Sequence, residues 1–134
     1  AYPHIVRFIL LLERRNQMLK EALVCMALAI FHESRGEIDV GQKAVAEVII
    51  NRSQERNLTV CEVVYEHGQF SNVHKWKIPQ ANNESWQKSL KIANDVINGD
   101  LKTNYTNGAK YFKVKSLKVK SKQVVYIGNH VFYK

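Results

Sequence analysis

The feature that most constrains the fold of this chain is a long helical pattern in its first quarter. Between residues 5 and 31, apolar side chains recur mostly at three- and four-residue steps, which is the spacing of one helix face. Gly36 is the expected end of this element, and a break near Gln17 is an alternative. The pattern therefore predicts one long helix, over about Ile5 to Phe31, as the first element of the fold.

Residues 5–12 are the most apolar part of this pattern, but they are too few to span a membrane. A spanning helix needs about 20 apolar residues, whereas this run contains Arg7 and is followed by three charged residues. No small-residue cleavage site comes after it, so a signal peptide is a poor interpretation as well. The run is better interpreted as part of a core helix or of a helix lying on a surface.

Three further helices are predicted downstream. An apolar stripe predicts one helix over residues 40–52, and the sequence of residues 59–62 has the form of a capping box that begins a short one. This short helix should end at Gly68, and a loop should follow over residues 69–82. The clearest helical face belongs to residues 83–98, after which a glycine is a natural stop.

The last third of the chain changes character. Asn107-Gly108 is a turn signal, and polar and apolar residues interleave over residues 109–122. Residues 124–127 and 131–133 are predicted to form short extended segments on either side of Gly128. With 134 residues, the chain suits a single domain. We expect it to be mainly α (α+β), with a small β or irregular C-terminal part.

The positive charge of the chain is unevenly distributed. The formal net charge is +8, and residues 100–134 carry eight basic side chains but only one acidic side chain. A basic surface attracts anionic partners over long range, and nucleic acid, anionic lipid and the bacterial wall all qualify. No nucleic-acid readout motif accompanies the basic residues. We therefore expect no specific nucleic-acid contact, and keep a basic binding module as an alternative.

Cys25 and Cys61 leave two alternatives open. They can form one disulfide, or both can be buried free thiols, because free cysteine packs as a small hydrophobic residue. Neither lies in a Cys-x-x-Cys motif or in a cluster with zinc-ligand spacing, so we expect no metal. A P-loop and a dinucleotide-binding fingerprint are also missing from the sequence, and no cofactor is expected.

The heptapeptide of residues 31–37 contains the strongest candidate for chemistry. Glu33 directly follows apolar residues at a helix C-terminus, whose partial negative charge disfavours a carboxylate. Partial burial would also keep a proton on this carboxyl, as a general acid requires. Glu37 is expected to be more exposed, where it could pair with Arg35 or orient the turn. The alternative is that both glutamates are solvated helix-end residues; His32 is expected to pack or to face solvent.

Three other motifs carry side chains that suit a sugar. They are Gln69-Phe70-Ser71, Tyr111 beside Phe112, and His130 near Phe132. Aromatic rings cover the apolar faces of sugars, and planar polar groups bind their hydroxyls. The alternative is that the three phenylalanines are core residues, which we expect to hold for two of them.

Taken in order, these motifs resemble the SleB/CwlJ-type cell wall hydrolases, the family of the spore cortex-lytic enzymes and of many phage lysis proteins. Each segment is weak evidence alone, whereas their order and spacing are specific. The similar segments lie within about residues 25–133, at residues 25–37, 41–52, 59–65, 68–71, 108–112 and 127–133.

The resemblance implies a lysozyme-like fold, related to the catalytic domain of resuscitation-promoting factors, with Glu33 as the catalytic acid. Residues 1–24 lie outside it and are expected to form a helical extension. The chain departs from the family at Asn72, where a tryptophan is usual, and at Lys113, where a histidine is usual. The expected substrate contacts are Gln69, Phe70, Ser71, Tyr111, His130 and Glu37.

The implied substrate is peptidoglycan, cleaved at the β-1,4 bond between N-acetylmuramic acid and N-acetylglucosamine. We favour a lytic transglycosylase, in which Glu33 serves as acid and then as base and leaves a 1,6-anhydromuramic end. A hydrolytic muramidase that uses Glu37 or Asp39 as a second carboxylate is the first alternative. A non-catalytic wall-binding or nucleic-acid-binding module is the second.

A lysine-rich run distinguishes the C-terminal part from the rest of the chain. It is either a solvated face or a surface that adheres to teichoic acid, lipopolysaccharide or peptidoglycan carboxylates. We expect a monomer that acts on the bacterial cell wall, made in the host cytoplasm if it is a phage lysin, or secreted if it is cut from a larger enzyme. The run consists of Lys113, Lys115, Lys118, Lys120 and Lys122.

Overall fold

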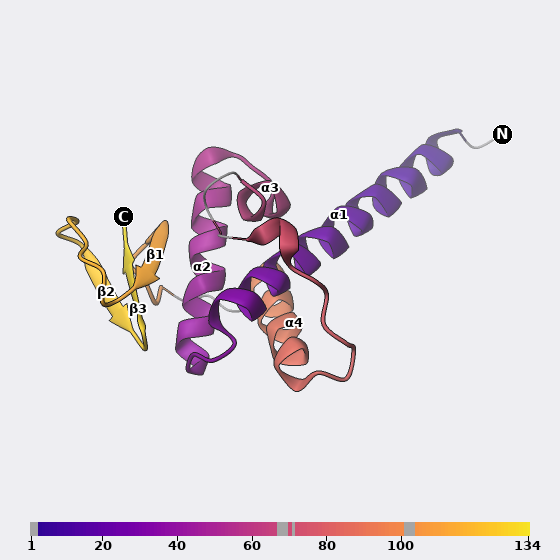
Figure 1. Ribbon diagram of the computed structural model, residues 1–134. Coiled ribbons are helices and arrows are strands. Elements are labelled where there is room, and N and C mark those ends of the chain that lie inside the picture. Colours follow the sequence, from indigo (N-terminus) through magenta and orange to yellow (C-terminus); the bar gives the residue numbers. More distant parts are fainter. Residues whose placement is uncertain (1–2, 67–69, 71, 101–103) are drawn as a thin grey trace.

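The computed structural model describes residues 3–66, 70, 72–100 and 104–134. It confirms the expected fold class, because helices form most of the molecule and a small sheet closes its C-terminal end (Figure 1). The elements in chain order are α1 (Pro3–Ser34), α2 (Asp39–Arg56), α3 (Val60–Val64), the 3-10 helix η1 (Val73–Lys75), α4 (Glu84–Ile97), β1 (Tyr111–Val114), β2 (Val124–Ile127) and β3 (His130–Tyr133).

Helix α1 runs without a break past Gln17, and its two halves have different surroundings. Residues 26–31 are buried, and α2, α3 and α4 pack around this part of the helix. Residues 3–21 are exposed and project away from the body (Figure 1). The apolar run of residues 5–12 is therefore not part of the core. Within the described ranges, no helix is long and apolar enough to cross a membrane.

Local sequence signals explain where the shorter helices begin and end. The predicted capping box at α3 is confirmed, because Thr59 accepts a hydrogen bond from the backbone N–H of Glu62 and the Glu62 carboxylate accepts one in return. Asn83 caps α4 with one hydrogen bond, which its side-chain oxygen accepts from the backbone N–H of Trp86. α3 ends at Val64, and the predicted stop at Gly68 lies outside the described residues.

The structure resolves the question of the cysteines in favour of the disulfide. Cys25 on α1 is bonded to Cys61 on α3, with their Cα atoms 5.3 Å apart. The two residues are 36 positions apart in the sequence, so the bond closes a long loop and restricts the unfolded chain. It fixes α3 against α1 just before the segment of α1 that ends in Glu33.

The C-terminal residues form a three-stranded antiparallel sheet with the order β1-β3-β2. The two predicted extended segments are β2 and β3, joined by a turn in which Gly128 has a φ of 57°. β1 was expected only as an interleaved stretch, and it pairs with β3 so that Tyr111 lies opposite Tyr133. Phe132 is fully buried against the helices and anchors the sheet to the core.

Two polar side chains of α2 hold the segment that leads into the sheet. The Glu47 carboxylate accepts hydrogen bonds from the backbone N–H groups of Tyr105 and Thr106, at 2.9 and 3.1 Å. Asn51 donates its side-chain N–H to the carbonyl of Ala109, at 2.9 Å. These contacts bring β1 alongside α2, and so place the edge of the sheet beside the end of α1.

Candidate active site

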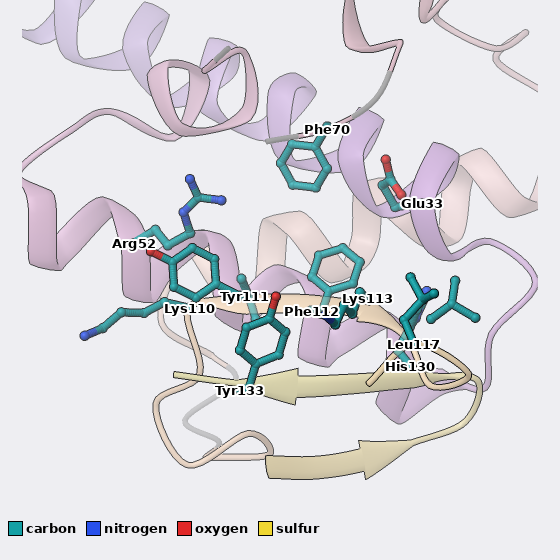
Figure 2. Close-up of a pocket in the computed structure, with 12 residues that line it drawn as sticks. Glu33, Arg52, Phe70, Lys110, Tyr111, Phe112, Lys113, Leu117, His130 and Tyr133 are labelled. Atoms are coloured by element: carbon teal, nitrogen blue, oxygen red, sulfur yellow. The ribbon is translucent and has the colours of Figure 1, made fainter. Parts of the chain in front are cut away.

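Glu33 lies in the last turn of α1 and lines a cavity of about 390 Å³ between the helices and the sheet (Figure 2). We call this cavity the Glu33 pocket. In the close-up, Glu33 and His130 lie toward one end of the pocket, and Arg52 and Lys110 lie toward the other. The full lining consists of Glu33, Val48, Arg52, Phe70, Lys110, Tyr111, Phe112, Lys113, Val114, Leu117, His130 and Tyr133.

The surroundings of the Glu33 carboxyl favour its protonated form. Glu33 is partly buried, and this burial raises its pKa above the ordinary value for glutamate. Among the described residues, no hydrogen bond or ion pair reaches the carboxyl to offset the burial. The guanidinium of Arg35 lies 4.8 Å from the ring centroid of Phe31 instead. A partly buried acid with a raised pKa is suited to donate a proton.

Glu37, which was expected to be the more exposed carboxyl and to orient the turn or pair with Arg35, is bound at the β2–β3 turn. Its side chain is 9% exposed, and it accepts hydrogen bonds from the backbone N–H and the side-chain N–H of Asn129, at 2.7 and 3.0 Å. Burial alone would raise the pKa of Glu37, but these hydrogen bonds, together with attraction to Lys115 and to the protonated form of His130, outweigh it and lower the pKa. Glu37 is not among the residues that line the Glu33 pocket.

Gly128 allows Glu37 to approach the β2–β3 turn this closely. A Cβ atom at this position would lie 2.7 Å from a carboxylate oxygen of Glu37, which is closer than real contacts allow. The positive φ of Gly128 also disfavours any residue with a side chain. Glu37 therefore joins the end of α1 to the turn of the sheet.

His130 lies between Glu37 and the pocket. Its Nδ1 atom is 3.5 Å from Glu37 Oε1, which is within ion-pair reach, but the geometry makes no hydrogen bond. Burial lowers the pKa of His130, and the charge of Glu37 opposes this only in part. The ring packs edge-on against Phe112, with centroids 5.1 Å apart. His130 therefore contributes a neutral imidazole to the pocket at pH 7.

Aromatic rings supply much of the remaining lining. Phe70 is buried, yet it reaches the pocket and lies 6.1 Å from Phe112 between centroids. Tyr111 is 45% exposed and stacks on Tyr133, at 5.6 Å between centroids. Phe70 and Phe132 are buried and Phe112 is only partly buried, which agrees with the expectation that two of the three phenylalanines are core residues.

The fold thus brings four of the predicted site residues to one cavity: Glu33, Phe70, Tyr111 and His130. Gln69 and Ser71 lie outside the described residues. Sequence reasoning missed Arg52, Lys110 and Tyr133 as lining residues. The signal in the sequence that Arg52 could line the pocket was its place at the end of an apolar helix face. Its burial and its ion pair with Glu66, at 2.7 Å, are visible only in the fold.

One departure from the family pattern is Asn72, where a tryptophan is usual. The tryptophan of this segment is Trp76, four residues later. Its ring stacks on His32, with centroids 5.0 Å apart and planes 10° apart, and does not line the Glu33 pocket. His32 also bonds the carbonyl of Lys77, at 3.1 Å, so it is a packing residue as expected. Asn72 has a φ of 63°, a conformation that asparagine tolerates better than tryptophan.

Among the residues that the structure describes, no group of three or more histidine, cysteine, aspartate or glutamate side chains is arranged to hold a metal ion. The described lining of the pocket offers one carboxyl group, an imidazole, two tyrosines and several cations.

Comparison with known proteins connects this geometry to one family. The family model described as "Cell Wall Hydrolase" matches residues 36–133, a range that begins just after Glu33. A curated relative, the spore cortex-lytic enzyme of Bacillus cereus, is 36% identical over 115 residues. The match covers 81% of this chain and 42% of the relative, so the chain spans less than half the length of that protein.

Two solved structures share the fold. The catalytic domain of the Bacillus cereus SleB protein matches with a TM-score of 0.70 and 33% identity, over 86% of this chain and 91% of the other. The catalytic domain of the germination-specific lytic transglycosylase SleB from Bacillus anthracis matches with a TM-score of 0.66 and 34% identity, over 84% and 93%. The fold is therefore the lysozyme-like one of these catalytic domains, and the chain belongs to the cell wall hydrolase family, of the SleB/CwlJ type.

Proposed function

We propose that this chain is a peptidoglycan-degrading enzyme that cleaves the β-1,4 bond between N-acetylmuramic acid and N-acetylglucosamine as a lytic transglycosylase. One observation carries the proposal: Glu33 is the only acidic residue among the described lining of its pocket, and burial raises its pKa. The names of the relatives support the substrate class, since one is a spore cortex-lytic enzyme and another a germination-specific lytic transglycosylase.

In this mechanism Glu33 acts twice. Its protonated carboxyl first donates a proton to the glycosidic oxygen, and the bond from that oxygen to the muramyl C1 breaks. The positive charge that develops at C1 is stabilised by the acetamido group of the substrate. The Glu33 carboxylate then takes the proton of the C6 hydroxyl, whose oxygen bonds to C1 and closes the 1,6-anhydro ring. Glu33 regains its proton, and no water is consumed.

The surroundings of the other nearby carboxylates favour this one-carboxylate route over hydrolysis. A glycoside hydrolase ordinarily uses two carboxyl groups across the scissile bond. Glu37 is held by Asn129, and Asp39 pairs with Lys43 at 2.6 Å and with Lys88 at 3.5 Å. Neither carboxylate lines the Glu33 pocket. A hydrolytic muramidase, which would need one of these carboxylates across the scissile bond, is therefore the second candidate.

The other residues of the pocket are assigned supporting roles in the proposal. Phe70 and Tyr111 offer ring faces to sugars, and the neutral His130 offers a polar atom to a hydroxyl. Gln69 and Ser71 stay predicted substrate contacts. We no longer place Glu37 among the substrate contacts, because its carboxylate is occupied by the β2–β3 turn.

We further propose that residues 25–133 form the catalytic unit of one domain, with residues 1–24 as a helical extension, and that it acts on the cell wall as a monomer. The Cys25–Cys61 disulfide supports a location outside the reducing cytosol. Delivery as a phage lysin and secretion within a larger enzyme both fit. Adhesion to anionic wall polymers through the lysine-rich run is part of the same proposal.

Digestion of purified peptidoglycan by the protein and by its Glu33→Gln variant tests the chemistry. Mass spectrometry of the soluble fragments should find 1,6-anhydromuramic ends with the parent protein and none with the variant. Reducing ends, which contain one more water, would identify a muramidase instead. Equal products from both proteins would remove Glu33 from the mechanism.

A further inference from the structure

Two cations and two tyrosines form a continuous row along one side of the Glu33 pocket. The Arg52 guanidinium lies 5.6 Å from the centroid of the Tyr111 ring, which stacks on Tyr133. The Lys113 ammonium lies 5.6 Å from the centroid of the Tyr133 ring. All four residues line the pocket, and Figure 2 shows the two tyrosines within it. Both distances are within the range of cation–π attraction.

The sheet register explains why these side chains meet. Tyr111 and Lys113 are two positions apart on β1, so both leave the same side of the strand. Tyr133 is the direct partner of Tyr111 on β3 and a diagonal neighbour of Lys113. β1 is an edge strand and β3 is the central strand, so Tyr111, Lys113 and Tyr133 extend from the edge of the sheet to its middle strand.

Of the two cations in the row, only Arg52 has an acidic partner among the described residues. Arg52 pairs with Glu66 at 2.7 Å, and the neighbouring Lys110 pairs with Glu55 at 2.6 Å. Lys113 has no acidic partner among the residues that the structure describes. It is partly buried at the pocket wall, so its charge is less screened than that of a fully exposed lysine. Among the described residues that line the pocket, Lys113 is therefore a cation without an acidic partner, and it can bind an anion.

We propose that Lys113 is a specificity-determining residue, which binds a carboxylate on the substituent of the muramic acid while the tyrosine pair receives a sugar face. This inference rests on the proposed function, because that function places muramic acid in the Glu33 pocket. Muramic acid carries a 3-O-lactyl group that ends in a carboxylate when it is unsubstituted. When a peptide is attached, the nearest carboxylates belong to that peptide.

A carboxylate is the ligand that the geometry favours. Lys113 and Glu33 line the same pocket, so an anionic group on the molecule that carries the scissile bond can reach Lys113. Lysine carries a compact charge on a flexible stem of four carbons, so Lys113 can follow a carboxylate on either source. The exposed lysines beyond β1 do not line this pocket and provide only a general attraction.

The test measures the affinity of soluble glycan strands in a Glu33→Gln background, where no cleavage interferes. The three probes are strands without peptides, strands with peptides, and peptide-bearing strands whose carboxylates have been amidated. Lys113→Gln should weaken the binding of carboxylate-bearing strands about tenfold, the value of one charge-assisted hydrogen bond. It should not change the binding of amidated strands. Lys113→Arg, which retains the charge, should keep most of the affinity.

Lys75→Gln is the matched control, since it removes the same charge from an exposed position outside the pocket. If Lys113→Gln binds peptide-free strands more weakly, the lactyl carboxylate is the ligand. If only the affinity for peptide-bearing strands falls, the ligand is a carboxylate of the peptide. Equal loss on amidated strands, or the same loss with Lys75→Gln, would overturn the proposal. Cleavage by the protein with Glu33 intact is followed separately. Absence of anhydro products there would contradict the proposed function without deciding the role of Lys113.

Discussion

The last turn of α1 and the turn that follows it each present a glutamate, and the two glutamates have opposite properties. Glu33 is partly buried, has no hydrogen-bond or ion-pair partner among the described residues, and has a raised pKa. Glu37 is four residues further along, its side chain is 9% exposed, and its pKa is lowered. Both residues are partly buried, and burial raises the pKa of each carboxyl, so the opposite direction at Glu37 has another cause.

The difference comes from the partners that the fold supplies. Asn129 donates two hydrogen bonds to Glu37, which stabilises the charged form more than burial disfavours it. The described residues supply nothing comparable to Glu33. Two titratable groups whose surroundings move their pKa values apart are typical of an acid and its support in an active site. The raised pKa suits Glu33 to the proposed proton transfer, and the hydrogen bonds of Glu37 join the end of α1 to the sheet.

The largest expected effect comes from Glu33→Gln. Removal of a general acid lowers turnover by about a thousandfold, so kcat on purified peptidoglycan should fall by this order. The thermal midpoint should stay the same or rise, because the variant no longer has an unpartnered buried carboxyl. Calorimetry alongside the kinetics checks both. A variant that lost stability as well as activity would show that Glu33 also has a structural partner.

Glu37→Gln should show the reverse pattern. The variant loses the charge that Asn129 stabilises and sets an amide N–H against its donors, which costs about 2 kcal/mol of folding free energy. Urea unfolding of the variant and of the parent protein measures this difference. Turnover should fall much less than for Glu33→Gln, when both are measured at a temperature where the variant is folded. A stable Glu37→Gln variant with greatly reduced turnover would make Glu37 part of the chemistry.

The sequence predicted one member of this pair better than the other, for a physical reason. Glu33 follows apolar residues in a helix, so its partial burial depends on local periodicity that is visible in the sequence. Glu37 owes its burial to Asn129, which is 92 residues away. No local signal connects the two, so the contact between Glu37 and Asn129 could not be predicted from the sequence.

The same reason explains the rest of the fold. The α3 capping box, the stop of α4 near Gly99 and the extent of α1 are local features, and all three were predicted. The disulfide, the pairing of β1 with β3, and the burial of Arg52 depend on contacts between distant segments. Four of the expected site residues lie at one cavity, where aromatic type and order in the sequence were sufficient to suggest them. The expected set was incomplete where an ion pair brings a charged residue into the pocket.

The pH dependence separates the two carboxyls further. Glu33 acts first as an acid, so the rate should fall as the pH rises through its raised pKa, by about tenfold per unit beyond it. The stabilising effect of Glu37 has the opposite dependence. Since its folded pKa is below the ordinary value of 4.5, its contribution is fully present above that pH and is lost as the pH falls through the folded pKa.

Turnover and urea stability measured over the same pH series check this prediction. In Glu37→Gln the acid loss of stability should become smaller, whereas the fall in rate at higher pH should remain. If the fall in rate disappeared in that variant, Glu37 rather than Glu33 would be the titrating acid.

The smallest effects are expected for alanine substitutions at three glycines. A comparison of the three separates the cost of backbone strain from the cost of a close contact with Glu37. Gly128 has both a positive φ and the contact of 2.7 Å to Glu37, Gly99 has only a positive φ of 75°, and Gly36 has neither. Alanine at Gly99 should cost about 1 kcal/mol of folding free energy from strain alone. Alanine at Gly36 should cost almost nothing, because no heavy atom lies within 4 Å.

Gly128→Ala should cost about 1 kcal/mol more folding free energy than Gly99→Ala. The added methyl group pushes Glu37 away from Asn129 and weakens one hydrogen bond. Urea unfolding of the three variants measures this order. The excess should disappear in a Glu37→Ala background, where the carboxylate that the methyl group meets is no longer present. If it persisted there, the cost would belong to the turn itself, and the link between the end of α1 and the sheet would not depend on this approach.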